Sequence, residues 1–234
     1  MGYSVCLPTS DRLCVVSLNW QSVMLMGDKG IVTWPTLRRT NQRLDLQSCR
    51  TANKVTSMQN DVRGLIRAVT EIQRIPYTWP APPTALSVRQ TGRGTCAGKH
   101  ALLREQLELL GLPTRRLMVI GLLVPDLWPD LQAVSGGMLE LHECLTVETT
   151  WVGPLLVDVT WHPAALRAGL SGTLEWDWLS DMVCAVAPVA SYAVSDDEFR
   201  AQKELLRARL YSPEQRAKRD QVLAEIADRA SRFQ

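Results

Sequence analysis

The stretch GRGTCAGKH at residues 92–100 gives the strongest indication of fold and chemistry in this sequence. Its glycines allow a sharp turn into a helix, and Thr95 is a residue type that favours the N-cap position. Cys96 is then expected in the first helical turn, where unpaired amide groups and the helix dipole favour the thiolate. Lys99 and His100 follow about one turn later, and we expect them to tune the charge around the sulfur. Because the thiolate is the reactive form, the stretch predicts a nucleophile; a buried structural cysteine is the alternative.

Two strand-like stretches supply partners for such a thiol. The first, LELHECLTV at residues 139–147, alternates like a half-buried strand and presents His142 as a candidate general base. The second, LLVDVTWHP at residues 155–163, places Asp158 at the end of an apolar strand, where an unpartnered charge would be costly. The intervening residues suffice for two neighbouring antiparallel strands joined by a turn at 148–153. The sequence therefore predicts that Asp158 orients His142, although a satisfied structural histidine is the plainer alternative.

His100 is a second histidine that could be mistaken for the base. It lies four residues after Cys96, on the same face of the predicted helix. The helix geometry limits the reach of a base on the nucleophile's own helix, so we expect His100 to serve in charge tuning or packing.

A zinc site is a further alternative, formed by four residues of the two strands: His142, Cys144, Asp158 and His162. The first two share a strand face, but no pair has the close spacing that is typical of zinc ligands, and the last two lie on either side of a strand end. We therefore expect no metal and no other cofactor.

Hydrophobic periodicity predicts the remaining elements. Apolar residues recur at helical spacing over residues 60–75, where Pro76 ends the helix, and again over residues 95–110, where Gly111 ends it. Strands are expected at residues 116–123, 138–149 and 154–160. The tail from residue 196 is expected to be helical, with a capping box that begins at Ser212. Because the helices are grouped before and after the strands, the pattern indicates an α+β fold.

The first 57 residues differ from the rest of the chain. They hold seven basic and three acidic residues and no glutamate, whereas every glutamate lies after residue 70. We hypothesise that residues 1–57 are an N-terminal extension, either loosely ordered or preceding the true start; a few strands or turns packed on the core are the alternative. Residues 58–195 are then the main domain, and residues 196–234 a C-terminal helical tail.

Composition excludes several classes of function. The net charge is +2, with 26 basic and 24 acidic residues, so there is no electrostatic case for binding nucleic acid or a membrane surface. No apolar run is long enough for a membrane span. The six cysteines are spread along the chain without close pairs, which suits a reducing compartment, and we expect a cytoplasmic location.

Taken together, these stretches resemble the transglutaminase-like superfamily. The matching features are the Gly-Thr-Cys helix entry, the leucine-rich helix after it, GLPTR at residues 111–115 and VDVTWHP at residues 157–163. The last two are similar to the family patterns Gly-Ile-Pro-Ala-Arg and Val-Asp-Ala-Thr-Trp-Asn-Pro. The resemblance covers roughly residues 60–165. The nearest subgroup is a set of small bacterial members that also carry an Ile-Pro-Tyr segment and a Lys-His pair after the cysteine.

The resemblance implies a papain-like core, in which the nucleophile begins a helix packed on an antiparallel sheet, and a Cys96–His142–Asp158 triad. It implies acyl transfer or hydrolysis at an amide bond of a peptide, protein or small amide, through an acyl-enzyme that water or an amine resolves. A non-catalytic binding module with the same fold is the alternative. The chain departs from the family pattern after the histidine, where Glu143-Cys144 replaces a dipeptide that ends in tryptophan.

The group that stabilises the oxyanion has no motif of its own in this sequence. The backbone amide of Cys96 is one expected donor. Gln90 and Trp79, which both lie upstream, are the candidates for the second donor. The sequence leaves open the acceptor, the substrate and the oligomeric state.

Overall fold

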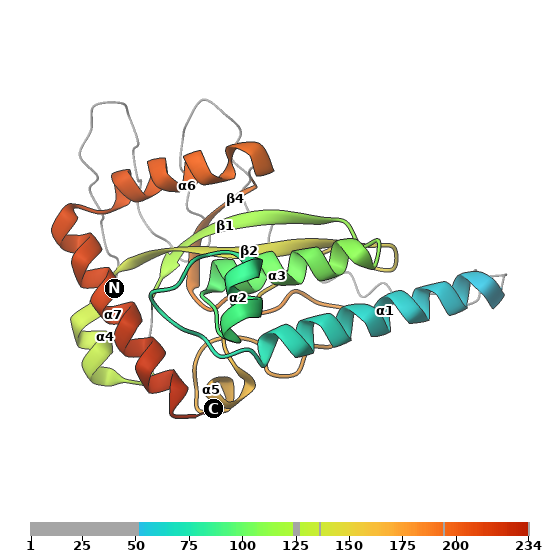
Figure 1. Ribbon diagram of the computed structural model, residues 1–234, viewed down its shortest axis with the longest axis horizontal. Coiled ribbons are helices and arrows are strands. Elements are labelled where there is room, and N and C mark those ends of the chain that lie inside the picture. The colour runs from blue at the N-terminus through green and yellow to red at the C-terminus, as the bar shows by residue number, and fades with distance from the viewer. Residues whose placement is uncertain (1–51, 124–126, 136, 194, 234) are drawn as a thin grey trace.

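The computed structural model describes residues 52–123, 127–135, 137–193 and 195–233. Within these residues the chain is α+β, with seven helices and one antiparallel sheet of four strands in the order β3-β2-β1-β4 (Figure 1). The elements in chain order are α1 (Ala52–Gln73), α2 (Ala85–Thr91), α3 (Cys96–Leu109), β1 (Thr114–Leu122), α4 (Pro129–Ser135), β2 (Leu139–Thr149), β3 (Gly153–Val157), α5 (Pro163–Arg167), β4 (Ala187–Ala193), α6 (Asp196–Leu210) and α7 (Pro213–Ser231).

The helix predicted over residues 60–75 is confirmed as α1, but it begins earlier, at Ala52. No glycine or proline interrupts residues 52–59, so nothing in the sequence stops the helix at residue 60. The boundary proposed at residue 57 therefore falls inside a helix. Residues 1–51 of the proposed extension lie outside the described residues.

The nucleophile-bearing helix is confirmed as α3, with Thr95 as its N-cap. The Thr95 side chain accepts a hydrogen bond of 3.2 Å from the Gly98 amide. Gly94 and Gly98 have a role that the sequence reading missed. A Cβ atom at either position would lie within 3.0 Å of the Val88 side chain. These glycines thus let α2, a short helix that was not predicted, pack closely on the start of α3.

The sheet register sets the positions of the site residues. In the β1–β2 pairing, His142 lies opposite Val119, and β3 pairs with the far half of β2. The strand predicted over residues 154–160 ends at Val157 instead. The three residues after Val157 leave the ladder because their polar groups bind neighbours from α3 and from one another.

Two layers of helix enclose the sheet. Neighbouring residues of a strand point to opposite faces. His142 meets the start of α3, whereas Glu143 meets Lys203 of α6, so these helices cover opposite faces, as Figure 1 shows. The strand β4, which was not predicted, pairs with the free edge of β1.

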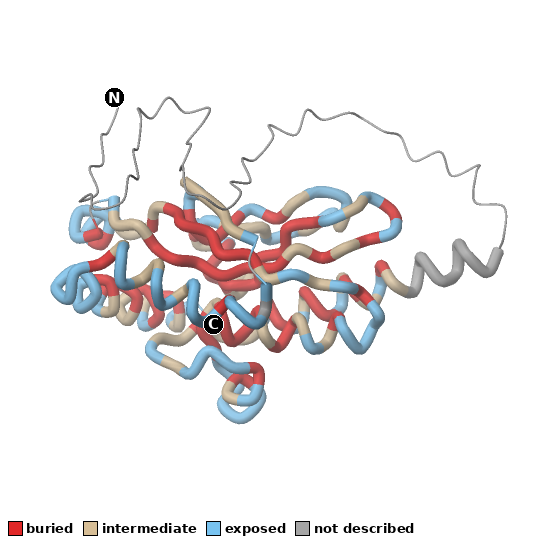
Figure 2. Tube along the Cα trace, turned by 90° about the horizontal axis from the view of Figure 1, so that it is seen from above, coloured by how far each residue is buried: buried red, intermediate tan, exposed pale blue. Residues whose placement is uncertain are grey.

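The C-terminal tail is helical, as predicted, and the capping box at Ser212 is confirmed. In α7, Val222, Leu223 and Ile226 are buried in one cluster with Trp161 and Leu166 of the segment after β3. The tail is therefore part of the packed core, and Figure 2 shows buried residues running from the sheet into the surrounding helices. No helix in the described part of the chain is long and apolar enough to cross a membrane.

Candidate active site

Cys96 is the first residue of α3 and is partly exposed, whereas its neighbours Thr95 and Ala97 are buried. Its thiol lies beside His142, close enough for the imidazole to act on the pKa of the sulfur. Burial raises the pKa of the thiol. The interaction with His142 and the charges of His142 and Lys203 lower it by more, so the net pKa is below its ordinary value. The site therefore favours the thiolate.

His142 connects the thiol to a buried carboxylate. Its Nε2–H donates to Oδ2 of Asp158 over 2.7 Å. Since Nε2 is taken, Nδ1 is the ring atom left for the sulfur of Cys96. Burial lowers the pKa of His142, but the charges of Asp158 and Cys96 and their hydrogen bonds outweigh it, so the net pKa is well above its ordinary value. The arrangement suits a thiolate–imidazolium pair.

Asp158 accepts four hydrogen bonds, which explains how a charge is tolerated at the end of an apolar strand. Oδ2 accepts from His142 and from the amide of Ala185, at 2.7 and 2.8 Å. Oδ1 accepts from the amide and the hydroxyl of Thr160, at 3.0 and 2.6 Å. Burial raises the pKa of Asp158, but the charge and hydrogen bond of His142 lower it more, so the residue stays ionised.

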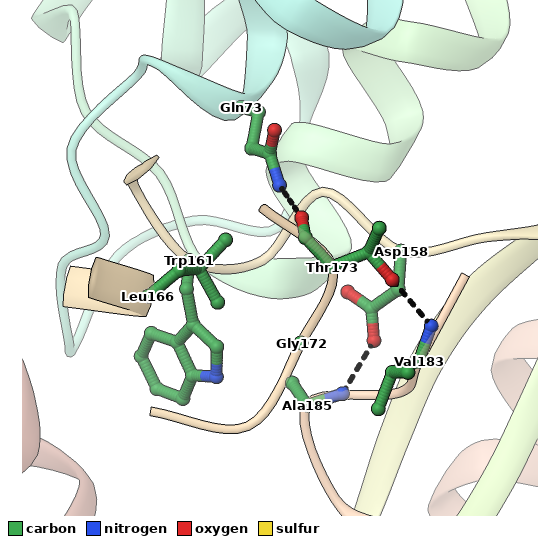
Figure 3. Close-up of a pocket in the computed structure, with 8 residues that line it drawn as sticks. All are labelled: Gln73, Asp158, Trp161, Leu166, Gly172, Thr173, Val183 and Ala185. Atoms are coloured by element: carbon green, nitrogen blue, oxygen red, sulfur yellow. Dashed lines mark hydrogen bonds between the residues drawn. The ribbon is translucent and has the colours of Figure 1, made fainter. Parts of the chain in front are cut away.

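The segment around Ala185 closes over the far side of Asp158. Figure 3 shows the small pocket there, with the carboxylate held by the Ala185 amide and Trp161 on the opposite wall. The amide of Val183 donates to the hydroxyl of Thr173, and the Gln73 side chain donates to the carbonyl of Thr173. These contacts tie α1 to the segment that orients the acid.

Of the two roles expected for His100, charge tuning and packing, the contacts fit packing. His100 is fully buried; its Nδ1–H donates to the carbonyl of Cys96 over 2.7 Å, and its Nε2 accepts from the amide of Val159 over 3.1 Å. These partners fix one neutral tautomer. Burial lowers the pKa of His100 to about 4, although the charge of Asp158 raises it. His100 thus joins the first turn of α3 to the strand end that carries Asp158.

Lys99 is also fully buried. The expected role in charge tuning did not predict this burial. Its ammonium group donates to three backbone carbonyls, those of Gln73, Ile75 and Thr160. Lys99 and His100 therefore both bind main-chain groups of the surrounding segments rather than the Cys96 side chain.

The two candidates for the second oxyanion donor are not brought to the thiol by any contact in the described residues. Gln90 is exposed on α2. Trp79 is half-buried, and its ring packs against the guanidinium group of Arg219, 4.9 Å from the ring centroid. The identity of the second donor stays a prediction.

The four residues of the alternative zinc site do not form one cluster. His142 and Asp158 bind each other, whereas Cys144 lies beside Cys184, and Nδ1 of His162 accepts from the Ala164 amide at the start of α5. Among the residues that the structure describes, no three histidine, cysteine or carboxylate side chains are grouped as metal ligands.

Several residues of the site were missed by sequence reasoning. Thr160 had a readable signal, because a threonine two residues after an aspartate commonly bonds back to it. Ala185 had none, since it contributes only its backbone amide. Comparison of the chain with models of protein families and with curated proteins finds no match. The family resemblance thus depends on the residues described above.

Proposed function

We propose that this protein is a cysteine-nucleophile enzyme of the transglutaminase type, with a papain-like core, that cleaves or transfers the acyl group of an amide. The observation that carries the proposal is that Cys96 lies beside His142, whose ring is in turn hydrogen-bonded to Asp158 over 2.7 Å. The three residues come from a helix start, a central strand and a strand end, in the order that the resemblance implies.

The proposed reaction begins with attack of the Cys96 thiolate on the amide carbonyl, which forms the carbon–sulfur bond and places negative charge on the carbonyl oxygen. The amide of Cys96, at the first residue of α3, has no hydrogen-bond partner within the helix and is suited to that oxygen. The His142 imidazolium gives its proton to the leaving amine as the carbon–nitrogen bond breaks. Water or a second amine then loses a proton to His142, attacks the thioester and restores the thiolate.

The contacts of Asp158 support its role as an orienting group. Its hydrogen bond fixes Nε2–H, so that Nδ1 faces the sulfur, and its charge stabilises the imidazolium. The carboxylate is itself fixed by Thr160 and Ala185, which keeps it from rotating away from the ring.

Selective alkylation tests the proposal. Iodoacetamide near pH 7, followed by peptide mass spectrometry, is expected to modify Cys96 much faster than the buried Cys144 and Cys184. His142→Ala should remove most of this difference. The labelled protein should also lose any turnover found in a screen of peptides and small amides.

A non-catalytic binding module would give a different result. In that case Cys96 would react no faster than the other cysteines, and His142→Ala would leave its rate unchanged. That outcome would overturn the proposed enzyme.

A further inference from the structure

Lys99 is among the largest of the fully buried side chains in the described residues, and it lies one helical turn after Cys96. Its Nζ is 2.8 Å from the carbonyl oxygen of Ile75, 2.9 Å from that of Thr160 and 3.3 Å from that of Gln73. A lysine is almost never fully buried unless its charge is compensated. Its burial beside the thiol therefore needs a reason.

Three acceptors around one nitrogen indicate the protonated form. An ammonium group has three N–H donors and no acceptor, so it satisfies all three carbonyls. A neutral amine has only two N–H bonds and would turn its lone pair toward the third carbonyl. Burial lowers the pKa of Lys99 more than the negative charges of Asp158 and Cys96 raise it, and the resulting pKa is about 7. The charge of Lys99 is thus coupled to the two anionic groups of the site.

The three carbonyls belong to two separate parts of the chain. Gln73 and Ile75 mark the end of α1. Thr160 belongs to the segment after β3, and its own amide and hydroxyl hold Asp158. Lys99 therefore joins the helix that carries the nucleophile to the segment that carries the acid.

We propose that Lys99 is a positioning residue of the thiol site, whose ammonium group holds α3 against the Thr160 carbonyl so that Cys96 and Asp158 face His142 together. This inference rests on the proposed function. One buried cation fixes the position of α3 relative to the segment that carries Asp158, and its positive charge favours the thiolate. Lys99 does not touch the sulfur, so it acts through the geometry and the charge of its neighbours.

The test is the pH dependence of Cys96 alkylation by iodoacetamide in Lys99→Met. Methionine keeps an unbranched stem but removes the charge and the three donors. We expect the alkylation midpoint to move to higher pH and the rate near pH 7 to fall about tenfold, which corresponds to ~1.4 kcal/mol. Lys218→Met, an exposed lysine of α7, is the matched control and should keep the original profile. A folded Lys99→Met variant with an unchanged profile would overturn the inference.

A second measurement decides the question if Lys99→Met does not fold. The Lys99 side-chain carbons of selectively ¹³C-labelled protein can be titrated by NMR in the original chain and in Cys96→Ala. Electrostatic coupling is reciprocal, so loss of the thiolate should lower the pKa of Lys99. An unchanged Lys99 titration would refute the coupling.

The two proposals fail in different ways. If Cys96 of the unmodified chain reacts no faster than Cys144 and Cys184, the proposed function is wrong. If Cys96 reacts fast and the Lys99 variants change nothing, only the role of Lys99 is wrong.

Discussion

His100 should make the folded protein sensitive to mild acid. Its ring bridges the Cys96 carbonyl and the Val159 amide as a neutral imidazole, and it is completely buried. Protonation would place a second N–H at Nε2, directly against the Val159 amide N–H, at a fully buried position. Burial, together with the nearby charge of His142, outweighs the charge of Asp158, so the folded state binds a proton only at low pH and the pKa of His100 falls to about 4.

The size of the effect follows from linkage. An unfolded chain protonates this histidine near pH 6.5, whereas the folded chain does so near pH 4. The folded pKa is depressed, so the contribution to stability is complete above pH 6.5 and is lost as the pH falls toward 4. The difference corresponds to about 3 kcal/mol. His142 acts in the opposite direction, because its raised pKa gives stability below pH 6.5 that is lost as the pH rises through its folded value.

Urea unfolding between pH 7.5 and 4.5 measures this contribution. His100→Gln keeps one donor and one acceptor without a titrating group. The free energy of unfolding should fall more steeply between pH 6.5 and 4.5 in the original chain than in His100→Gln, by about 2 kcal/mol over that interval. His162→Gln is the control, since His162 lies at a half-buried helix cap and should leave most of the fall in place. Equal slopes for the original chain and His100→Gln would refute the assignment of a buried neutral ring.

Two further predictions concern Asp158 and Lys203. Asp158→Asn should slow turnover by roughly tenfold to a hundredfold, because an amide can hold the ring but cannot stabilise the imidazolium; steady-state rates on any substrate found will show it. Turnover equal to the original would remove Asp158 from the triad. Lys203→Met should move the Cys96 alkylation profile to higher pH, because Lys203 lowers the pKa of the thiol and also compensates Glu143. A profile shifted to lower pH would contradict this electrostatic account.

Helices and strands with a clear hydrophobic period could be predicted from the sequence. In α3, for example, Leu103 and Leu107 lie at helical spacing, and both side chains are completely buried. By contrast, α2 is seven residues long and buries only Ala85 and Val88, which is too little for a recognisable period. The edge strand β4 is mostly exposed or half-buried, so its sequence lacks the alternation of a strand with one buried face.

The candidate site was predictable in its residue types but not in its connections. Cys96, His142 and Asp158 each stand in a stretch whose local pattern sets the element that carries it. The burial of Lys99 and His100 depends on the end of α1 and on the strand end, which lie far away in the sequence. One signal was available for His100, since it precedes Leu103 and Leu107 at the same helical spacing and so belongs to the buried stripe.

The C-terminal helices have an electrostatic connection to the thiol. Strand β2 carries buried carboxylates at Glu140 and Glu143, on either side of His142, and the charge of Glu140 acts to raise the pKa of Cys96. Arg219 of α7 binds Glu140 through two guanidinium nitrogens.

Glu143 is compensated in a similar way by Lys203 of α6, over 2.9 Å, and by Arg116 of β1, over 2.7 Å. A buried carboxylate that loses its cation is either protonated or strongly destabilising. Both carboxylates flank the proposed base, so the cations of the tail keep negative charge away from the thiol. The tail therefore contributes both to the packed core and to the stability of the thiolate. It contributes none of the three proposed catalytic side chains.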